Sequence, residues 1–196
     1  MLLGLGTGST AARLLPPLAA RNLDITCVAT SPSTSQAARE LGIDIVSFAG
    51  LEAPARLDMT IDGADQVDPA CWLVKGGGAA HTREKAVAAA ADRFIVIVSS
   101  NKVVERLSPP IPLELAEFGL ASTFARVQPA RLREVPRSPD GGVIADYLAE
   151  FDDPEEVATW LSTEPGVVEH GLFPASMVAE VLIGRGQAVD RMTPPS

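Results

Sequence analysis

Short apolar runs alternate with helical patterns over the first half of the chain, in the order typical of a parallel α/β sheet. Glycines, prolines and polar residues separate the runs. We predict helices at residues 11–20, 36–41 and 80–92, the first kinked or ended early by Pro16-Pro17 and the last favoured by its alanines. Residues 31–35 are predicted to be a polar loop. The predicted strands are 2–5, 25–29, 43–48, 57–61 and 94–99.

The second half begins with a proline cluster, Ser108-Pro109-Pro110-Ile111-Pro112, which predicts a domain boundary. The elements expected after it follow the order βαββαβ, the split arrangement of a ferredoxin-like domain. They are strand 113–117, helix 119–127, strand 131–135, a turn at 140–142, strand 143–147, helix 154–162 and strand 167–172.

Residues 178–183 are predicted to return as a strand to the first sheet, ahead of a tail that contains glycine and proline. The predicted fold class is therefore α/β, a Rossmann-like open parallel sheet with a second, smaller ferredoxin-like α+β domain. The predicted catalytic domain comprises residues 1–108 and 174–196, and the small domain comprises residues 109–173.

Composition narrows the function classes. The 196 residues are 46% hydrophobic, and no apolar run approaches the roughly 18 residues needed to span a bilayer, so we expect a soluble protein with no membrane partner. The first residues lack the basic flank and apolar core of a secretion signal, which favours the cytoplasm. A net charge of −9 argues against nucleic acid as a partner. Cys27 and Cys71 have no metal-type spacing and are expected to be small buried thiols.

The first candidate for chemistry is the glycine-rich turn Gly4-Leu5-Gly6-Thr7-Gly8-Ser9-Thr10, between a strand and a helix. Glycines there let several backbone N–H groups point at one anion, and the hydroxyls of Thr7, Ser9 and Thr10 add donors. The spacing matches neither a dinucleotide fingerprint nor a Walker loop. The turn therefore indicates either a phosphate site or a tight turn with Ser9 or Thr10 as a helix cap.

The second candidate is Asp62-Gly63-Ala64-Asp65, which follows a predicted strand at its carboxyl end, where open α/β sheets bind ligands. Two carboxylates at this spacing can bind sugar hydroxyls or share a proton. The alternative is a solvated turn.

The third candidate combines Lys75-Gly76-Gly77-Gly78 with the helix that follows it. Three glycines are costly to order unless the backbone must approach something closely, and a lysine beside exposed N–H groups suits a developing oxyanion. Glu84 falls on the apolar stripe of Val87 and Ala88, where burial would raise its pKa and improve it as a general base. Glu84 could instead pair with a neighbouring cation, and His81 is expected to touch the pocket without being catalytic.

These motifs, in this order, resemble type A ribose-5-phosphate isomerase, and the resemblance covers nearly the whole chain. Further segments contribute to it: Arg83-Glu84-Lys85, Ser100-Asn101-Lys102, residues 165–173 and residues 181–184. Family members interconvert ribose 5-phosphate and ribulose 5-phosphate without a metal or other cofactor, through a cis-enediol(ate), in the non-oxidative pentose phosphate pathway. The resemblance implies the same reaction here, a sugar phosphate as the partner molecule, and a homodimer or homotetramer.

Carried over by position, the resemblance implies a role for each motif. Glu84 would move the proton between carbon 2 and carbon 1, and Asp62 would assist ring opening and hydroxyl proton transfer. Lys75 and the amides of Gly76, Gly77 and Gly78 would steady the oxyanion. The hydroxyls of the sugar would be bound by Asp62, Gly63, Ala64 and Asp65, and its phosphate by Thr7, Gly8, Ser9, Thr10 and Lys102.

Three features differ from the family pattern. The chain begins almost on its first strand, where family members carry a helix; His81-Thr82 replaces a more apolar pair; and residues 127–142 are short and proline-rich. Two other functions remain open. One is a catalytically silent sugar-phosphate sensor, which would have no use for Glu84, and the other is a deaminase or acyl-carrier transferase of similar fold, whose motifs match less well.

Overall fold

A seven-stranded sheet forms the centre of the first of two units in the computed structural model, which describes residues 1–195. This unit contains residues 1–63, 83–101 and 176–195, and the second unit contains residues 64–82 and 102–175. Residues 64–82, 102–108 and 174–175 thus lie in a different unit from the one that the predicted domain boundaries gave them. The functional division into domains 1–108 with 174–196 and 109–173 stays a prediction.

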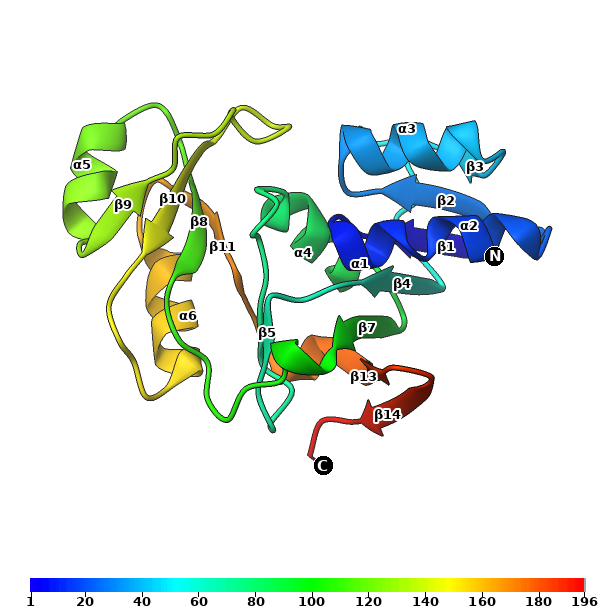
Figure 1. Ribbon diagram of the computed structural model, residues 1–196. Helices are drawn as coiled ribbons and strands as arrows, with labels where there is room; N and C mark the ends of the chain where they lie inside the picture. The colour runs from blue at the N-terminus through cyan, green and yellow to red at the C-terminus, as the bar shows by residue number, and fades with distance from the viewer. Residues whose placement is uncertain (196) are drawn as a thin grey trace. The chain divides into compact units, whose positions relative to one another are not determined.

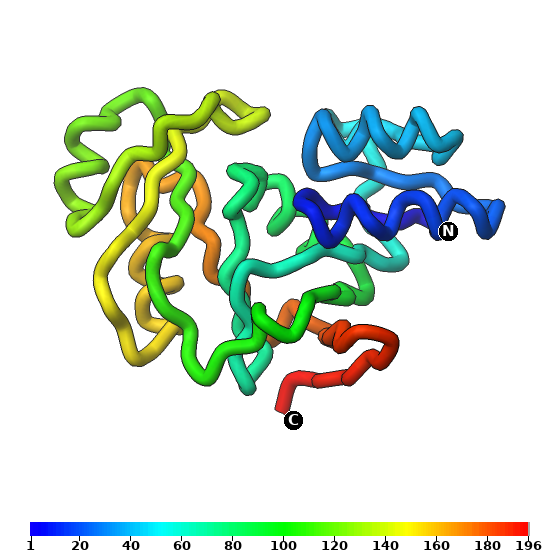
Figure 2. Tube along the Cα trace, in the orientation of Figure 1, coloured from blue at the N-terminus to red at the C-terminus, as the bar shows by residue number. Residues whose placement is uncertain are grey.

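The strands of the first sheet lie in the order β14-β13-β7-β4-β1-β2-β3 (Figure 1). Six of them are parallel, and β14 pairs antiparallel with β13. Figure 2 shows the orange and red C-terminal segment returning beside the green β7, as predicted from the apolar pattern. The strands are β1 (Leu2–Leu5), β2 (Thr26–Ala29), β3 (Asp44–Ile45), β4 (Met59–Asp62), β7 (Phe94–Ser99), β13 (Val178–Arg185) and β14 (Ala188–Met192).

Helices cover both faces of this sheet. On one face, Leu3 and Leu5 of β1 pack with Leu15 and Leu18 of α2 and with Ala38 of α3. On the other, Val87 of α4 clusters with apolar residues from β2 and from the approach to β4. The helices are α1 (Ser9–Ala12), α2 (Leu15–Ala20), α3 (Pro32–Glu40) and α4 (His81–Ala89). The predicted Rossmann-like α/β class is confirmed.

Two predicted segments need correction. The helix expected at 11–20 is two helices, and the prolines lie in the first turn of α2, because proline lacks an N–H and is tolerated at a helix start. The loop expected at 31–35 is wrong, since α3 begins at Pro32. The Ser31 side chain caps this helix by accepting a hydrogen bond of 3.2 Å from the Thr34 N–H, a start signal strengthened by proline at the first position.

The tail expected after residue 183 is also wrong, because β13 runs on to Arg185 and β14 follows it. Four of the five residues of β14 are exposed. An edge strand of this kind has no buried face, so it lacks the alternation of apolar and polar residues that reveals a strand in a sequence.

The second unit contains an antiparallel sheet in the order β11-β8-β10-β9. Two helices complete the sequence order βαββαβ, so the predicted ferredoxin-like arrangement is confirmed. Asp153 caps the second helix, as the sequence indicates, by accepting a hydrogen bond of 2.8 Å from the Glu155 N–H. The elements are β8 (Ile111–Leu115), α5 (Leu120–Arg126), β9 (Ala130–Leu132), β10 (Val143–Tyr147), α6 (Pro154–Thr163) and β11 (Val167–His170).

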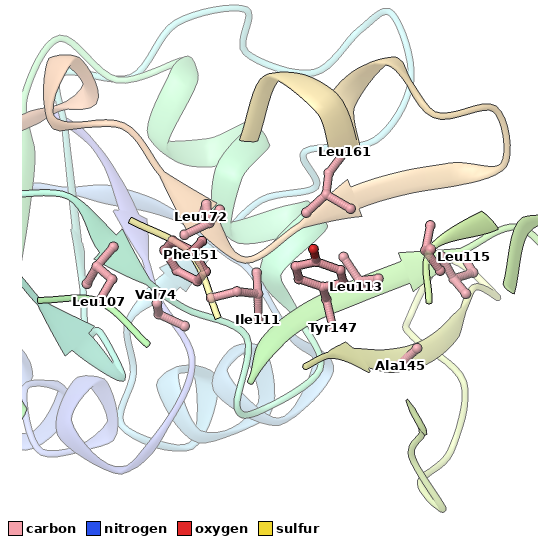
Figure 3. Packing of buried hydrophobic residues seen from close by; sticks show 11 residues of the cluster. Val74, Leu107, Ile111, Leu113, Leu115, Ala145, Tyr147, Phe151, Leu161 and Leu172 are labelled. Atoms are coloured by element: carbon pink, nitrogen blue, oxygen red, sulfur yellow. The ribbon is translucent and has the colours of Figure 1, made fainter. Parts of the chain in front are cut away.

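The core of this unit lies between its sheet and α6 (Figure 3). Leu113 and Leu115 of β8 and Leu161 of α6 are fully buried, and the rings of Tyr147 and Trp160 lie 5.5 Å apart. All five residues of β8 are buried, including Pro112, which lies outside the predicted strand 113–117. Pro112 has no N–H to donate, but its carbonyl accepts a hydrogen bond of 2.7 Å from Gly171.

A small antiparallel sheet, β12-β6-β5, completes the second unit and supplies part of the site. Its strands are β5 (Gln66–Val67), β6 (Leu73–Val74) and β12 (Leu172–Phe173). Two short 3-10 helices are η1 (Ser100–Lys102) and η2 (Ala175–Met177). Within residues 1–195, no helix has the length and apolar character needed to cross a bilayer.

Both cysteines are free and fully buried, as predicted. Burial raises the pKa of the Cys27 thiol to about 11, chiefly because a thiolate would be poorly solvated there. The same cause raises the pKa of Cys71. Both thiols are therefore protonated near neutral pH and act as small packing groups.

Candidate active site

Asp62 ties together two loops at the carboxyl edge of the parallel sheet. It is the last residue of β4, which lies beside β1, and it is 2% exposed. Its Oδ1 accepts hydrogen bonds from the N–H groups of Thr7, at 3.1 Å, and Gly63, at 2.7 Å. The structure thus brings the first two candidate motifs into direct contact, although 55 residues separate Thr7 from Asp62.

Two glycines of the first loop are required for different reasons, Gly6 for space and Gly8 for its backbone conformation. A Cβ on Gly6 would lie 1.8 Å from Asp62 Oδ1, so only glycine lets the carboxylate approach. Gly8 has a φ of +108° and forms the N-cap of α1. Since α1 has only four residues, its macrodipole is small, and an anion here would rely on the local N–H groups and hydroxyls.

Two residues that the sequence analysis missed support this loop. The hydroxyls of Thr30 and Thr7 are 2.7 Å apart, and Thr34 donates a hydrogen bond of 3.1 Å to the Gly6 carbonyl. Both threonines follow β2, the neighbour of β1 in the sheet. Their position after a strand at the same edge was the available signal.

Replacing Gly6 by alanine should disrupt the contact between the loop and Asp62. We expect the free energy of unfolding to fall by about 1–3 kcal/mol, because the added methyl group must displace the carboxylate or the backbone. Denaturant unfolding measures this. Gly63→Ala is the matched control in the same region, since its Cβ would meet no atom closer than 3.7 Å. Equal losses in the two variants would show that Gly6 has no steric role.

In the second unit, Asp65 holds the glycine-rich segment that follows β6. Its Oδ2 accepts a hydrogen bond of 2.8 Å from the Gly77 N–H, and its own N–H donates to the Val74 carbonyl at 2.7 Å. A Cβ on Gly77 would lie 2.9 Å from Asp65 Oδ1. The second and third candidate motifs are therefore also in contact, and Gly77 has to be glycine for that contact to form.

Lys75 carries a positive charge into a buried position. It follows β6 directly and is 3% exposed, and its N–H donates a hydrogen bond of 2.8 Å to the Gly171 carbonyl. Its Nζ lies 5.5 Å from the centroid of the Phe173 ring, within range of a cation–π interaction. After Lys75 the chain turns at Gly76, which has a φ of +105° and whose carbonyl accepts from the Ala79 N–H at 3.0 Å.

Helix α4 follows this turn and carries Glu84 in its first turn. Glu84 is 4% exposed, and Val87 and Ala88, on the same side of the helix, are buried as the sequence pattern indicates. His81 is fully buried, and a Cβ on Gly76 would lie 2.7 Å from its Nδ1. The imidazole therefore packs against the glycine turn, and its Nε2 lies 3.4 Å from the Glu169 carbonyl oxygen.

The start of α4 is also tied to β8. Thr82 donates a hydrogen bond to the carboxylate of Glu114, which is 1% exposed and also accepts from Ser138. Sequence reasoning missed this cluster, because a glutamate within an apolar strand gives no sign of its distant partners. Lys102 ends η1, three residues after the last residue of β7, and is partly buried.

Each unit thus gathers part of the predicted set. Thr7, Gly8, Ser9, Thr10, Asp62, Gly63 and Glu84 belong to the first unit, and Ala64, Asp65, Lys75, Gly76, Gly77, Gly78 and Lys102 belong to the second. Hydrogen bonds join Thr7 to Asp62 in the first unit and Asp65 to Gly77 in the second. Their catalytic and binding roles stay predictions.

A buried carboxylate beside a glycine loop at the carboxyl end of a parallel strand, as Asp62 is in the first unit, is typical of an α/β enzyme. A sequence model of the family "Ribose 5-phosphate isomerase A (phosphoriboisomerase A)" matches residues 26–188. The chain belongs to this family, and it is an isomerase.

Individual relatives agree with this assignment. The Ribose-5-phosphate isomerase A of Caulobacter sp. (strain K31) is 42% identical over 99% of this chain and 91% of its own length. The solved structure of the Methanocaldococcus jannaschii enzyme has a TM-score of 0.90 and 32% identity, covering 98% of this chain and 91% of that one. A D-ribose-5-phosphate isomerase solved with phospho-erythronic acid has a TM-score of 0.89 and 33% identity, with coverages of 98% and 90%.

Proposed function

We propose that this chain interconverts D-ribose 5-phosphate and D-ribulose 5-phosphate by metal-independent proton transfer through a cis-enediol(ate). The observation that carries the proposal is the buried carboxylate of Glu84, in the first turn of the helix that follows the Lys75–Gly78 segment. A buried carboxylate suits general-base chemistry. Membership of the ribose 5-phosphate isomerase A family indicates that the substrate is a sugar phosphate.

In the forward direction, the open-chain sugar presents an aldehyde at carbon 1 and an acidified C–H at carbon 2. Glu84 takes the proton from carbon 2, the electron pair of that C–H bond forms a double bond between carbons 1 and 2, and the π pair of the carbonyl moves onto the aldehyde oxygen to give an enediolate. Lys75 and the glycine amides stabilise this negative charge. Asp62 assists ring opening and passes the hydroxyl proton between the two oxygens, and Glu84 returns its proton to carbon 1 to form the ketose.

The rest of the set holds the substrate. Asp65, next to Gly63 and Ala64, binds sugar hydroxyls in this proposal. The phosphate is bound by Thr7, Gly8, Ser9 and Thr10 together with Lys102, which explains how an acidic chain takes an anionic substrate. The contact of Asp62 with the Thr7 N–H supports a coupling of phosphate binding to the acid–base group.

The purified chain should convert ribose 5-phosphate to ribulose 5-phosphate in deuterated water. Deuterium from the solvent should appear in the product at carbon 1, which receives the transferred proton. NMR of the reaction mixture measures both. The Glu84→Gln variant, purified in the same way, controls for a contaminating isomerase. Binding of ribose 5-phosphate with neither product nor exchange would favour the sensor alternative, which has no use for a buried base.

We also propose that the enzyme acts in the cytoplasm, in the non-oxidative pentose phosphate pathway, and as a homodimer or homotetramer. Light scattering of the purified chain at micromolar concentration measures its assembly, and a monomer would contradict that part of the proposal.

A further inference from the structure

Within the second unit, the side chain of Arg133 extends from the sheet β11-β8-β10-β9 to the glycine turn at Gly76 and Gly77. It follows β9, and its backbone N–H donates a hydrogen bond of 2.9 Å to the Ile144 carbonyl of β10. Its Nη1 donates to the Gly76 carbonyl oxygen at 2.9 Å and approaches the Gly77 carbonyl oxygen at 3.4 Å. Its side chain is only 16% exposed.

Asp146 fixes the direction of this side chain. The Nε and Nη2 atoms of Arg133 both donate to Asp146 Oδ1, at 2.9 and 2.6 Å. Asp146 is a nearly buried residue of β10, with a side chain 5% exposed. Because the guanidinium is planar, the two hydrogen bonds from Nε and Nη2 to Asp146 also fix the direction of Nη1. Nη1 points to the glycine turn.

Arg133 determines which way the N–H groups of the glycine turn point. In a trans peptide the C=O and N–H point in opposite directions. The peptide between Gly76 and Gly77 is held on one side by Arg133 and on the other by Asp65, which accepts from the Gly77 N–H at 2.8 Å. With the Gly77 carbonyl turned toward Arg133, the Gly78 N–H is directed away from it.

Glycines sample more backbone conformations than other residues, so this segment needs outside contacts to keep its N–H groups in place. A cation at a carbonyl oxygen also polarises the peptide and strengthens the donor on its other side. The Asp146 carboxylate also lies 3.5 Å from the guanidinium of Arg131, so it is shared between two arginines and only partly offsets the charge of Arg133.

We propose that Arg133, held by Asp146, is a positioning residue of the isomerase, which fixes the peptides of Gly76 and Gly77 and thereby orients the Gly78 amide for the enediolate oxyanion. Arg133 acts through the backbone and does not touch the substrate. The role in catalysis rests on the proposed function, whereas the role in ordering the turn does not.

Three variants test this, namely Arg133→Gln, Arg133→Lys and, as the control, Arg106→Gln. Arg106 forms an ion pair with Asp152 in the same unit, but both side chains are more than half exposed. In Arg133→Gln, kcat should fall about 10- to 100-fold with KM within about 3-fold, because a small misplacement of catalytic groups is costly while ground-state contacts remain. Arg133→Lys should recover part of kcat, since an ammonium can still donate to the Gly76 carbonyl.

Two further readouts separate positioning from general stability. Amide hydrogen exchange, followed by NMR, should speed up at Gly77 and Gly78 in Arg133→Gln and stay unchanged in Arg106→Gln. The affinity for phospho-erythronic acid, whose carboxylate resembles the enediolate, should fall more than the affinity for ribose 5-phosphate.

Unchanged exchange at Gly77 and Gly78 in Arg133→Gln would overturn the proposal, as would a loss of kcat matched by Arg106→Gln. If Arg133→Gln does not fold, the same comparisons apply to Arg133→Lys and Asp146→Asn. If the wild-type chain binds ribose 5-phosphate without converting it, the proposed function fails, and the exchange rates still decide whether Arg133 orders the turn.

Discussion

Replacing Glu84 by glutamine should lower kcat by about 10³-fold and leave KM nearly unchanged. The amide keeps the shape of the side chain in a position that is 4% exposed, but it cannot accept the carbon-bound proton. Steady-state kinetics with ribose 5-phosphate measures the effect, and thermal unfolding checks the fold.

Glu155→Gln is the matched control for this variant. Glu155 also lies in the first turn of a helix, α6, but its side chain is exposed. Its replacement should change kcat by less than about 2-fold, in keeping with the small effects of surface substitutions. A parallel loss of binding, stability and turnover in Glu84→Gln would instead make Glu84 a structural residue.

Replacing Lys75 by methionine should lower kcat/KM by about 10²–10³-fold, the effect expected when one stabilising group for an oxyanion is removed. The variant should remain folded, because methionine keeps the length and packing of the stem and a buried ammonium is costly to desolvate. Kinetics and denaturant unfolding measure the two quantities.

Lys85→Met removes the same charge from a partly exposed position on α4 and serves as the control. We expect it to retain most of the activity. If Lys75→Met loses stability in proportion to its activity, the lysine is needed for the fold around Phe173 rather than for the oxyanion.

The sequence predicted the parts of the fold that carry a strong local signal. β1 and β7 have the predicted bounds, since β1 is a leucine-rich run cut short by glycine and β7 is an apolar run that ends at serine. β10 also has its predicted bounds, set by the turn at residues 140–142 before it. Helix α3 was predicted at residues 36–41, but its start at Pro32 was not, because serine, proline and threonine together are typical of a loop as well as of a helix start.

The candidate site shows a similar division. Glycines and ionisable residues at strand ends identified the segments that form it, because those residue types are needed there for local reasons. The contacts from Thr34 to Gly6 and from Arg133 to Gly76 were not predictable, since they join residues 28 and 57 positions apart. Such contacts depend on strand order and register, which local patterns do not specify.

The exposed edge strand β14 bears on how the protein behaves when it is concentrated. An edge strand offers unpaired backbone groups to the strands of other molecules. Here the edge is charged, with ion pairs from Arg185 to Asp190 and from Arg191 to Glu180 linking it to β13. Charges at an edge oppose strand-to-strand association, so we expect this short hairpin to disfavour edge-to-edge pairing between copies of the sheet.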